Sequence, residues 1–189
     1  MADEVRDEAW LEGVFRAHHR AVLAYAARRV PDEADDVVAE VFAAAWRHRA
    51  TVPAEALPWL YRTAAHHVLH RRRSTARRSR LVGRLGGLGG DDAPTSSLDP
   101  TDEVVDRLDA VARVTRVLDA LPPRDAEILR LSAWEQLDVA SIAYVLSISP
   151  SAVRVRLHRA RRRAEHLLAV PDPEASARTA PTPVPEEIR

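Results

Sequence analysis

The arginines near the C-terminal end of the chain are the residues best suited to chemistry. Six arginines and a single acidic residue lie between Pro150 and His166. A planar guanidinium group donates two parallel hydrogen bonds to phosphate oxygens or to the major-groove edge of guanine. This composition favours duplex DNA as a partner. The simpler alternative is a solvated amphipathic helix with a cationic face.

The spacing around these arginines predicts a helix-turn-helix. Asp138 can cap a short helix that ends near Leu146, and residues 147–149 form the turn. Ser149 then caps a second helix that has Pro150 at its first position, where a missing N–H costs nothing. Caps, turn and helices are in register, which favours a DNA-binding motif over an isolated amphipathic helix.

The period of 3.6 residues divides the second helix into a buried and an outward side. The apolar residues that fall within one narrow arc are Val153, Leu157, Ala160, Ala164 and Leu168. The outward stripe consists of Ser151, Val155, His158 and Arg162, and it is flanked by Arg154 and Arg159. We interpret these six residues as the DNA-contacting set of this helix.

Charge is segregated along the chain, although 28 basic and 28 acidic residues give a formal net charge of zero. Residues 59–90 hold eight arginines and no carboxylate, whereas residues 91–109 hold seven acids and one arginine. Such segregation produces a local basic surface that the total charge conceals. The chain has no cysteine, which excludes disulfides and thiolate chemistry. With an acidic N-terminus and no long apolar run, we expect a cytoplasmic protein without membrane insertion.

The apolar spacing predicts an all-α protein made of two small helical domains joined by a flexible linker. Helical periodicity appears in residues 8–30, 33–48, 58–73, 102–121 and 124–136. We expect Asp32 to cap the second of these helices. The expected organisation is a first domain over 8–75, a linker over 76–102 that contains five of the six glycines, a second domain over 103–170 and a disordered tail over 171–189.

Catalytic and metal chemistry find little support in the residues. Asp35 and Asp36 are adjacent and lie at a helix start, where acids compensate the helix dipole. His66 and His70 are one helical turn apart, but no third ligand with a zinc spacing accompanies them. The glycine-rich segment follows no strand and lacks the Lys-Ser/Thr of a phosphate loop. We therefore expect no enzyme activity, no catalytic residues, no metal and no cofactor.

Three motifs, in this order, resemble the extracytoplasmic-function sigma factors of bacterial RNA polymerase. They are the acidic and apolar stretch 35–46, the stretch 58–64 that opens with Pro-Trp-Leu-Tyr-Arg, and the stretch 121–131 followed by the helix-turn-helix. Each motif alone is weakly specific, and the three in order are strongly so. The resemblance covers residues 11–73 as sigma region two and residues 106–168 as sigma region four.

The resemblance implies a role for each segment. Its polymerase-binding stretch, which meets the clamp helices of the largest subunit, corresponds to Asp35, Asp36, Val38, Glu40, Val41 and Phe42. Its minus-ten DNA contacts correspond to Arg62, His66, Arg71, Arg72 and Arg73, and the loop 49–57 would select an extruded base. The helix-turn-helix would read the minus-thirty-five element. The flap of the second-largest subunit and an anti-sigma factor are the other partners that the resemblance suggests.

Four residues depart from the pattern of the family. Ala39 replaces a common glutamine, His66 a usual asparagine, Val155 a small polar residue and Ser147 a turn glycine. We expect these changes to alter which promoter sequence is preferred more than the function itself, because none removes a required charge or backbone feature. The alternative functions are a dimeric helix-turn-helix regulator that acts without joining polymerase and, less favoured, an adaptor that binds a protein through its helices.

Overall fold

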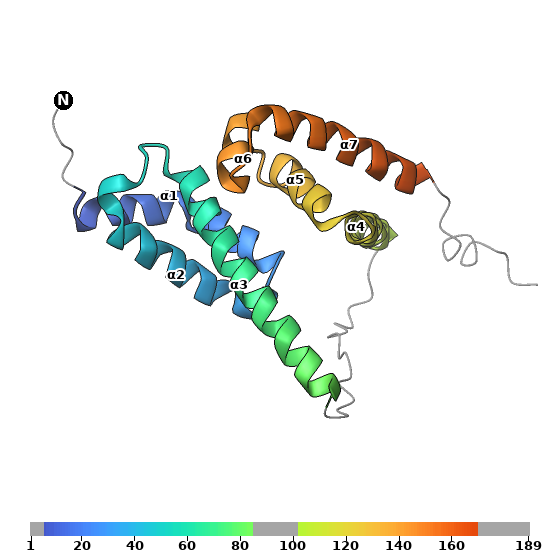
Figure 1. The fold of residues 1–189 in the computed structure, drawn as a ribbon, viewed down its shortest axis with the longest axis horizontal. Helices are drawn as coiled ribbons and strands as arrows, with labels where there is room; N and C mark the ends of the chain where they lie inside the picture. Colours follow the sequence, from blue (N-terminus) through green and yellow to red (C-terminus); the bar gives the residue numbers. More distant parts are fainter. Residues whose placement is uncertain (1–5, 85–101, 170–189) are drawn as a thin grey trace, which may run out of the picture. The chain divides into compact units, whose positions relative to one another are not determined.

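The computed structural model describes residues 6–84 and 102–169, and within them every regular element is helical (Figure 1). This confirms the predicted all-α class. The elements in chain order are α1 (Glu8–Ala27), η1 (Pro31–Glu33), α2 (Ala34–Arg47), η2 (Arg49–Thr51), α3 (Ala56–Arg84), α4 (Asp102–Ala120), α5 (Pro123–Ala133), α6 (Val139–Leu146) and α7 (Pro150–Ala169). The predicted disordered tail and most of the predicted linker lie outside the described residues.

The chain forms two compact units that do not follow its order. The first comprises Met1–Ser97 with Arg130–Arg154, and the second comprises Leu98–Leu129 with Val155–Arg189. The sequence instead predicts a division at the linker, with everything after it in a second domain. The difference arises because α6 packs against α3 and so belongs with the first three helices.

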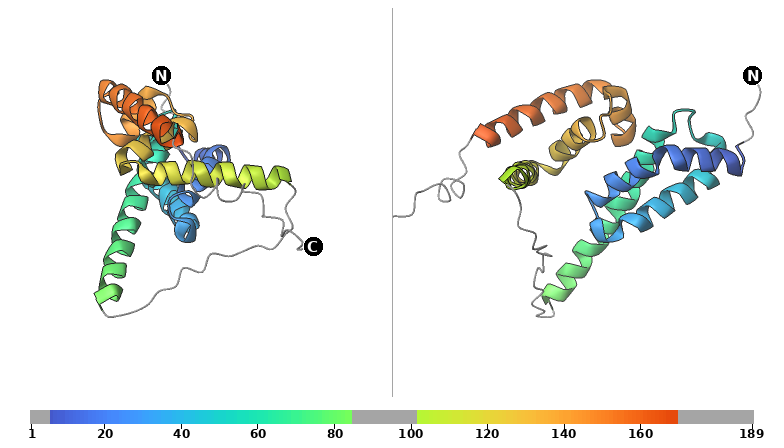
Figure 2. Two further views of the ribbon diagram at one scale, coloured as in Figure 1. Left: turned by 90° about the vertical axis from the view of Figure 1, so that its right-hand side faces the viewer. Right: turned by 180° about the vertical axis from the view of Figure 1, so that it is seen from behind.

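Helices α1, α2 and α3 pack together around the core of the first unit (Figures 1 and 2). Tyr25, Val37, Val41 and Leu60 are among its fully buried side chains. The rings of Tyr25 and Tyr61 lie 5.2 Å apart and join α1 to α3. This apolar packing fixes the faces of α2 and α3 that remain for partners.

Helix α3 is longer than its apolar periodicity predicts. The sequence places its end near Arg73 and a linker from residue 76, but the helix continues to Arg84. Residues 74–82 contain neither glycine nor proline and include three arginines, one alanine and one leucine, which are strong helix formers. Apolar periodicity shows where a helix packs against a core, and the helix can continue beyond that point. The predicted linker is therefore wrong for residues 76–84.

The start of α2 differs from the predicted cap. Asp32 lies inside η1, and no side chain makes a capping hydrogen bond to α2. Pro31 at the first position of the 3₁₀ turn sets its φ and leads the chain into α2. Asp35 and Asp36 lie in the first turn of α2, where they interact favourably with the helix dipole.

The second unit has a small apolar core. Leu118, Leu121 and Ala126 are buried, and Ala164 and Leu167 pack against them. The sequence predicts Leu168 on the buried side of α7, but its side chain is 38% exposed. Leu167, which is partly buried, packs against this core in its place.

The predicted caps and turn of the helix-turn-helix are confirmed. The backbone N–H of Ser141 donates to Asp138 Oδ1 over 2.7 Å, and the N–H of Ala152 donates to Ser149 Oγ over 3.2 Å. Hydrogen bonds from the backbone and then the side chain of Ser141 lower the pKa of Asp138. A depressed carboxyl pKa means that this cap persists above the ordinary value of the group and is lost only as the pH falls through the folded value.

The turn residue Ser147 has left-handed backbone angles, φ 54° and ψ 44°. Such angles cost a non-glycine residue about 1–2 kcal/mol. We expect Ser147→Gly to raise the free energy of unfolding by about 0.5–1 kcal/mol, because part of this strain is offset by the flexibility of glycine in the unfolded chain. The midpoint of urea denaturation measures the change. Ser151→Gly, in the first turn of α7, is the matched control and should destabilise; a loss of stability in Ser147→Gly would contradict the strain.

Candidate nucleic-acid and polymerase interfaces

One face of α3 carries three of the five residues predicted to contact minus-ten DNA. Arg62, His66 and Arg73 are separated by four and seven positions, so they fall on the same side of the helix. His66 and Arg73 are exposed, and Arg62 is half-buried. A cationic helix face of this kind suits contacts to the DNA backbone.

Helix α6 covers the N-terminal end of this α3 face. The guanidinium carbon of Arg62 lies 5.0 Å from the centre of the Tyr144 ring, and α6 packs against α3. Tyr144 still exposes 37% of its surface. A guanidinium over an aromatic face is attracted by the ring quadrupole, which holds Arg62 in place.

Arg71 lies on the opposite side of α3 from Arg62. Nine positions separate the two residues, which is about two and a half turns. The Arg71 side chain is 16% exposed, and it forms ion pairs with Glu33, with Glu40 at 2.9 Å and with Asp36 at 3.6 Å. Arg71 is predicted to contact DNA, but in this structure its side chain is directed to the acids of η1 and α2.

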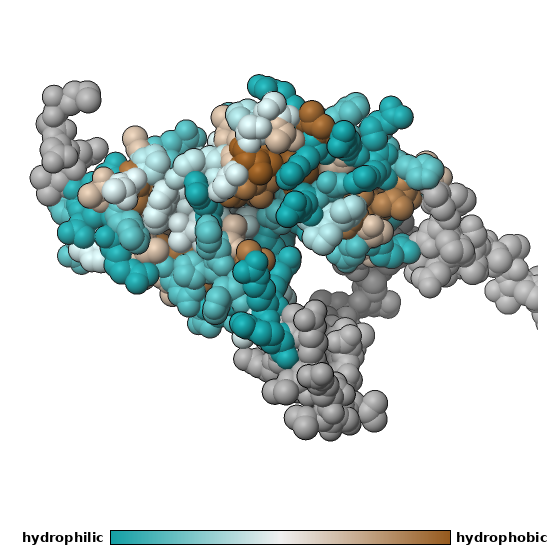
Figure 3. All heavy atoms as spheres, viewed as in Figure 1, coloured by the Kyte–Doolittle hydropathy of each residue, from teal (hydrophilic) through white to brown (hydrophobic). Residues whose placement is uncertain are grey.

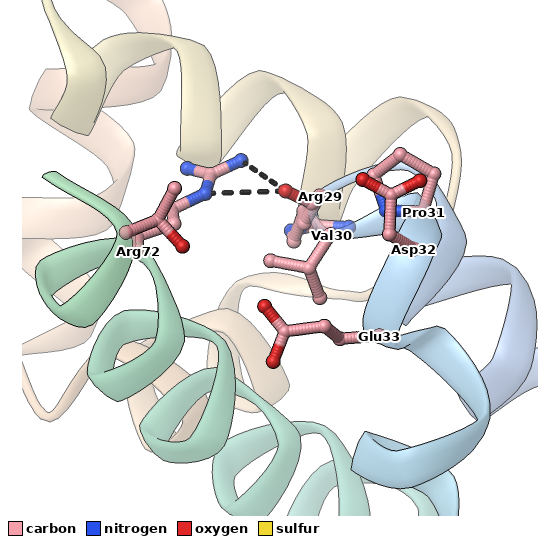
Figure 4. Close-up of a pocket in the computed structure, with 7 residues that line it drawn as sticks. Arg29, Val30, Pro31, Asp32, Glu33 and Arg72 are labelled. Carbon is pink, nitrogen blue, oxygen red and sulfur yellow. Dashed lines mark hydrogen bonds between the residues drawn. The ribbon is translucent and has the colours of Figure 1, made fainter. Parts of the chain in front are cut away.

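Arg72 contributes to a shallow pocket of about 390 Å³ where α1 meets α3 (Figure 4). Its Nε and Nη2 donate to the carbonyl oxygen of Arg29 over 3.3 and 3.2 Å. Glu33 and Pro31 line the same pocket. Arg72 therefore ties the end of α1 to α3, while much of its side chain remains exposed.

The acids of α2 are accessible, but the three apolar residues predicted to bind polymerase are not. Asp35 is exposed, and the Asp36 side chain is 73% exposed. Val38, Val41 and Phe42 are exposed by only 5%, 0% and 6%. The sequence predicts that these three contact polymerase, which is corrected: they form the core side of α2, and the Phe42 ring packs 4.8 Å from that of Phe15.

The loop that would select an extruded base is held at both edges. The side chain of Arg6 donates to the carbonyl oxygens of Arg49 and Val52. Val52 is 2% exposed and anchors the loop in the core, whereas residues 53–55 are exposed. The guanidinium of Arg49 lies 4.4 Å from the Trp46 ring centre, which adds an aromatic surface next to the loop.

All six residues predicted to contact DNA from α7 are exposed. These are Ser151, Arg154, Val155, His158, Arg159 and Arg162. Hydrophilic residues, in teal, lie along much of α7 (Figure 3). Sequence reasoning missed Arg161, which is exposed and seven positions after Arg154, hence on the same side of the helix. Arg163 differs from its neighbours because it pairs with Asp125 of α5.

A buried ion-pair cluster forms at the residues just before α6, and sequence reasoning missed it. The Glu135 carboxylate, with 0% of its side chain exposed, accepts hydrogen bonds from Arg28 over 2.8 Å and from Arg29 over 2.9 Å. The Arg29 guanidinium also lies 3.6 Å from the Tyr25 ring centre. Burial, and then the charge of Glu135, raise the pKa of Tyr61, so its phenol stays neutral.

Metal and membrane sites are absent from the described part of the chain. No group of three or more histidine and acidic side chains could hold a metal ion there, and His66 and His70 are both exposed. None of the described helices combines the length and the apolar character that crossing a bilayer requires.

Comparisons with known proteins identify the family of the two helical regions. The family model for Sigma-70 region 2 matches residues 14–78, and the model for Sigma-70, region 4 matches residues 112–163. The chain is 30% identical over 162 residues to the ECF RNA polymerase sigma factor SigL of Mycobacterium tuberculosis, and the match covers 82% of this chain and 86% of SigL.

Two solved structures share the fold. The sigma factor RpoE of Bartonella quintana, solved with the anti-sigma factor NepR, has a TM-score of 0.61 at 17% identity, covering 85% of this chain and 98% of RpoE. CnrH, solved with the cytosolic domain of CnrY, has a TM-score of 0.58 at 25% identity, covering 86% of this chain and 89% of CnrH.

These findings define a promoter-recognition subunit with sigma regions two and four. The chain belongs to the ECF RNA polymerase sigma factors. It binds core RNA polymerase and directs promoter-specific transcription initiation through minus-ten and minus-thirty-five recognition. The matching region two does not favour the alternative of a dimeric regulator that acts without polymerase.

Proposed function

We propose that polymerase and DNA use different helices of the first unit. Asp35 and Asp36 of α2 bind the clamp helices of the largest polymerase subunit, and Arg62, His66 and Arg73 of α3 engage the minus-ten element. The observation that carries this division is the separation of exposed charge: exposed acids at the start of α2, and cations on one face of α3. Opposite charges on separate faces let each partner be attracted without repelling the other.

On α7 the N-terminal half reads bases and the later half contacts phosphates. Recognition helices contact base edges through their first residues. Ser151, Arg154, Val155 and His158 occupy this part of the exposed stripe. Arg159, Arg161 and Arg162 follow along the exposed side and contact the DNA backbone. Arg163 is left out of this set because it pairs with Asp125.

This assignment predicts two different losses. Arg154→Ala should relax the preference at one or two minus-thirty-five positions by about 1–3 kcal/mol, which is the value of a bidentate arginine–guanine contact. Arg161→Ala should weaken all promoters equally and lower the slope of affinity against salt by about one. Binding of a randomised promoter library by holoenzyme, at two salt concentrations, measures both. An unchanged preference in Arg154→Ala, Val155→Ala and His158→Ala would refute base reading by α7.

The protein further acts without catalytic chemistry of its own, in the cytoplasm where polymerase meets the chromosome. An anti-sigma factor restrains it, and support comes from CnrH, which was solved bound to the cytosolic domain of CnrY and is 25% identical. The flap of the second-largest polymerase subunit holds the region-four part. The loop 49–57, anchored by Val52 and Arg6, selects the extruded minus-ten base.

A further inference from the structure

A cluster of charged side chains joins α3 to the acids at the start of α2. Arg71 is its centre, with Glu33 and Glu40 on its two Nη atoms and Asp36 at 3.6 Å. Glu40 has a second partner, because His67 Nδ1 lies 2.6 Å from its other carboxylate oxygen. The acids predicted to face polymerase are thus partly engaged inside the protein.

The engagement divides the acids into two kinds. The side chains of Glu33 and Glu40 are 39% and 46% exposed and are held by Arg71, whereas that of Asp36 is 73% exposed. Asp35 is exposed, and no ion pair or hydrogen bond of its side chain is found within the described residues. Among the acids of this cluster and its neighbour Asp35, the side chains most accessible to a basic partner are those of Asp35 and Asp36, although Asp36 also lies 3.6 Å from Arg71.

Arg71 is suited to this role by its shape and burial. A planar guanidinium can hold two carboxylates at fixed angles, which an ammonium group cannot do. The Arg71 side chain is mostly covered, so solvent screens these pairs less than fully exposed ones. The hydrogen bond that Arg71 donates to Glu33 raises the pKa of Arg71, which keeps the group charged.

We propose that Arg71 is a positioning residue for polymerase binding: it fixes Glu33 and Glu40 against α3 and so sets the orientation in which Asp35 and Asp36 meet the clamp helices. This rests on the proposed function of α2. In this proposal Arg71 does not contact DNA. It links α3 to α2, so that the position of α3 determines the position of the α2 acids. Arg71 touches neither partner and acts only through the acids.

The test compares charge-matched variants of the full chain. The dissociation constant for core RNA polymerase, from fluorescence titration, should rise about three- to tenfold in Arg71→Gln, as expected for loss of coupling between contacting residues. Arg71→Lys should show a smaller rise, because it keeps the charge without the fork. Arg20→Gln removes the same charge at an exposed position of α1 and should leave the affinity unchanged.

The decisive arm removes the partners of Arg71. In a Glu33→Gln, Glu40→Gln background, Arg71→Gln should cost much less affinity than in the native chain, because only the longer pair of Arg71 with Asp36 remains. The salt slope of promoter binding by holoenzyme should stay unchanged in Arg71→Gln and fall by about one in Arg73→Gln, which loses a phosphate contact.

Three outcomes would overturn the proposal. They are an unchanged polymerase affinity in Arg71→Gln, an undiminished loss in the background without Glu33 and Glu40, and a lowered salt slope in Arg71→Gln. If Arg71→Gln does not fold, the polymerase affinity and the salt slope of Arg71→Lys are measured instead, and an unchanged polymerase affinity would overturn the proposal. A polymerase affinity that survives Asp36→Arg would instead refute the proposed function of α2, so the two failures are distinguishable.

Discussion

Glu135→Ala should lower the free energy of unfolding by about 3–5 kcal/mol, the cost of removing one partner from a buried ion pair. The Arg29 side chain is 1% exposed and would keep its charge after the Glu135 carboxylate is removed. Arginine cannot relieve this cost by losing its proton. The change should appear as a lower midpoint in urea denaturation followed by circular dichroism.

Two further variants make this prediction specific. Glu165→Ala removes an exposed carboxylate from α7 and should change stability by less than about 0.5 kcal/mol. Arg29→Met combined with Glu135→Leu should lose much less than Glu135→Ala, because no charge remains buried. A Glu135→Ala protein as stable as Glu165→Ala would show that the pair is open in solution.

Asp36→Arg should abolish stable binding to core polymerase while leaving the fold intact. The side chain is 73% exposed and does not contribute to the core, so helical circular dichroism should be preserved. Like charges across an interface cost several kcal/mol, which predicts an affinity loss of about 100-fold or more. Titration of labelled protein with core polymerase measures the loss, and run-off transcription should fail in parallel.

Glu12→Arg is the control for charge reversal. Glu12 lies on α1 in an exposed pair with Arg16, and such pairs contribute little to stability. This variant should bind polymerase normally. Equal affinity of Asp36→Arg and the native protein would remove α2 from the polymerase interface.

The local features of the fold were predictable because they depend on residues close in sequence. Asp138 and Ser149 cap neighbouring backbone N–H groups, and Pro150 starts a helix whatever surrounds it. The exposed stripe of α7 followed from its period. The resemblance assigned Val38, Val41 and Phe42 to polymerase, whereas their spacing places them on the apolar side of the helix, where they are buried.

The contacts that sequence could not predict join distant residues. Glu135 lies more than one hundred positions from Arg28 and Arg29, and nothing in its neighbourhood marks it as buried. Arg71 stands in a run of three arginines, and only the position of α2 distinguishes it from Arg73. A helical projection of α3 would have shown Arg71 opposite Arg62, which is the one available signal.

The packing of α6 on α3 makes one surface serve two competitors. If Arg62 engages the minus-ten element as proposed, DNA and Tyr144 compete for its side chain, and the promoter would bind those molecules in which α6 has moved away. The apparent affinity is the intrinsic affinity multiplied by the fraction of such molecules. If about one molecule in a hundred were open, the apparent affinity for DNA would fall by about two orders of magnitude. A partner that holds α6 away from α3 would therefore restore the apparent affinity for DNA without contacting DNA itself.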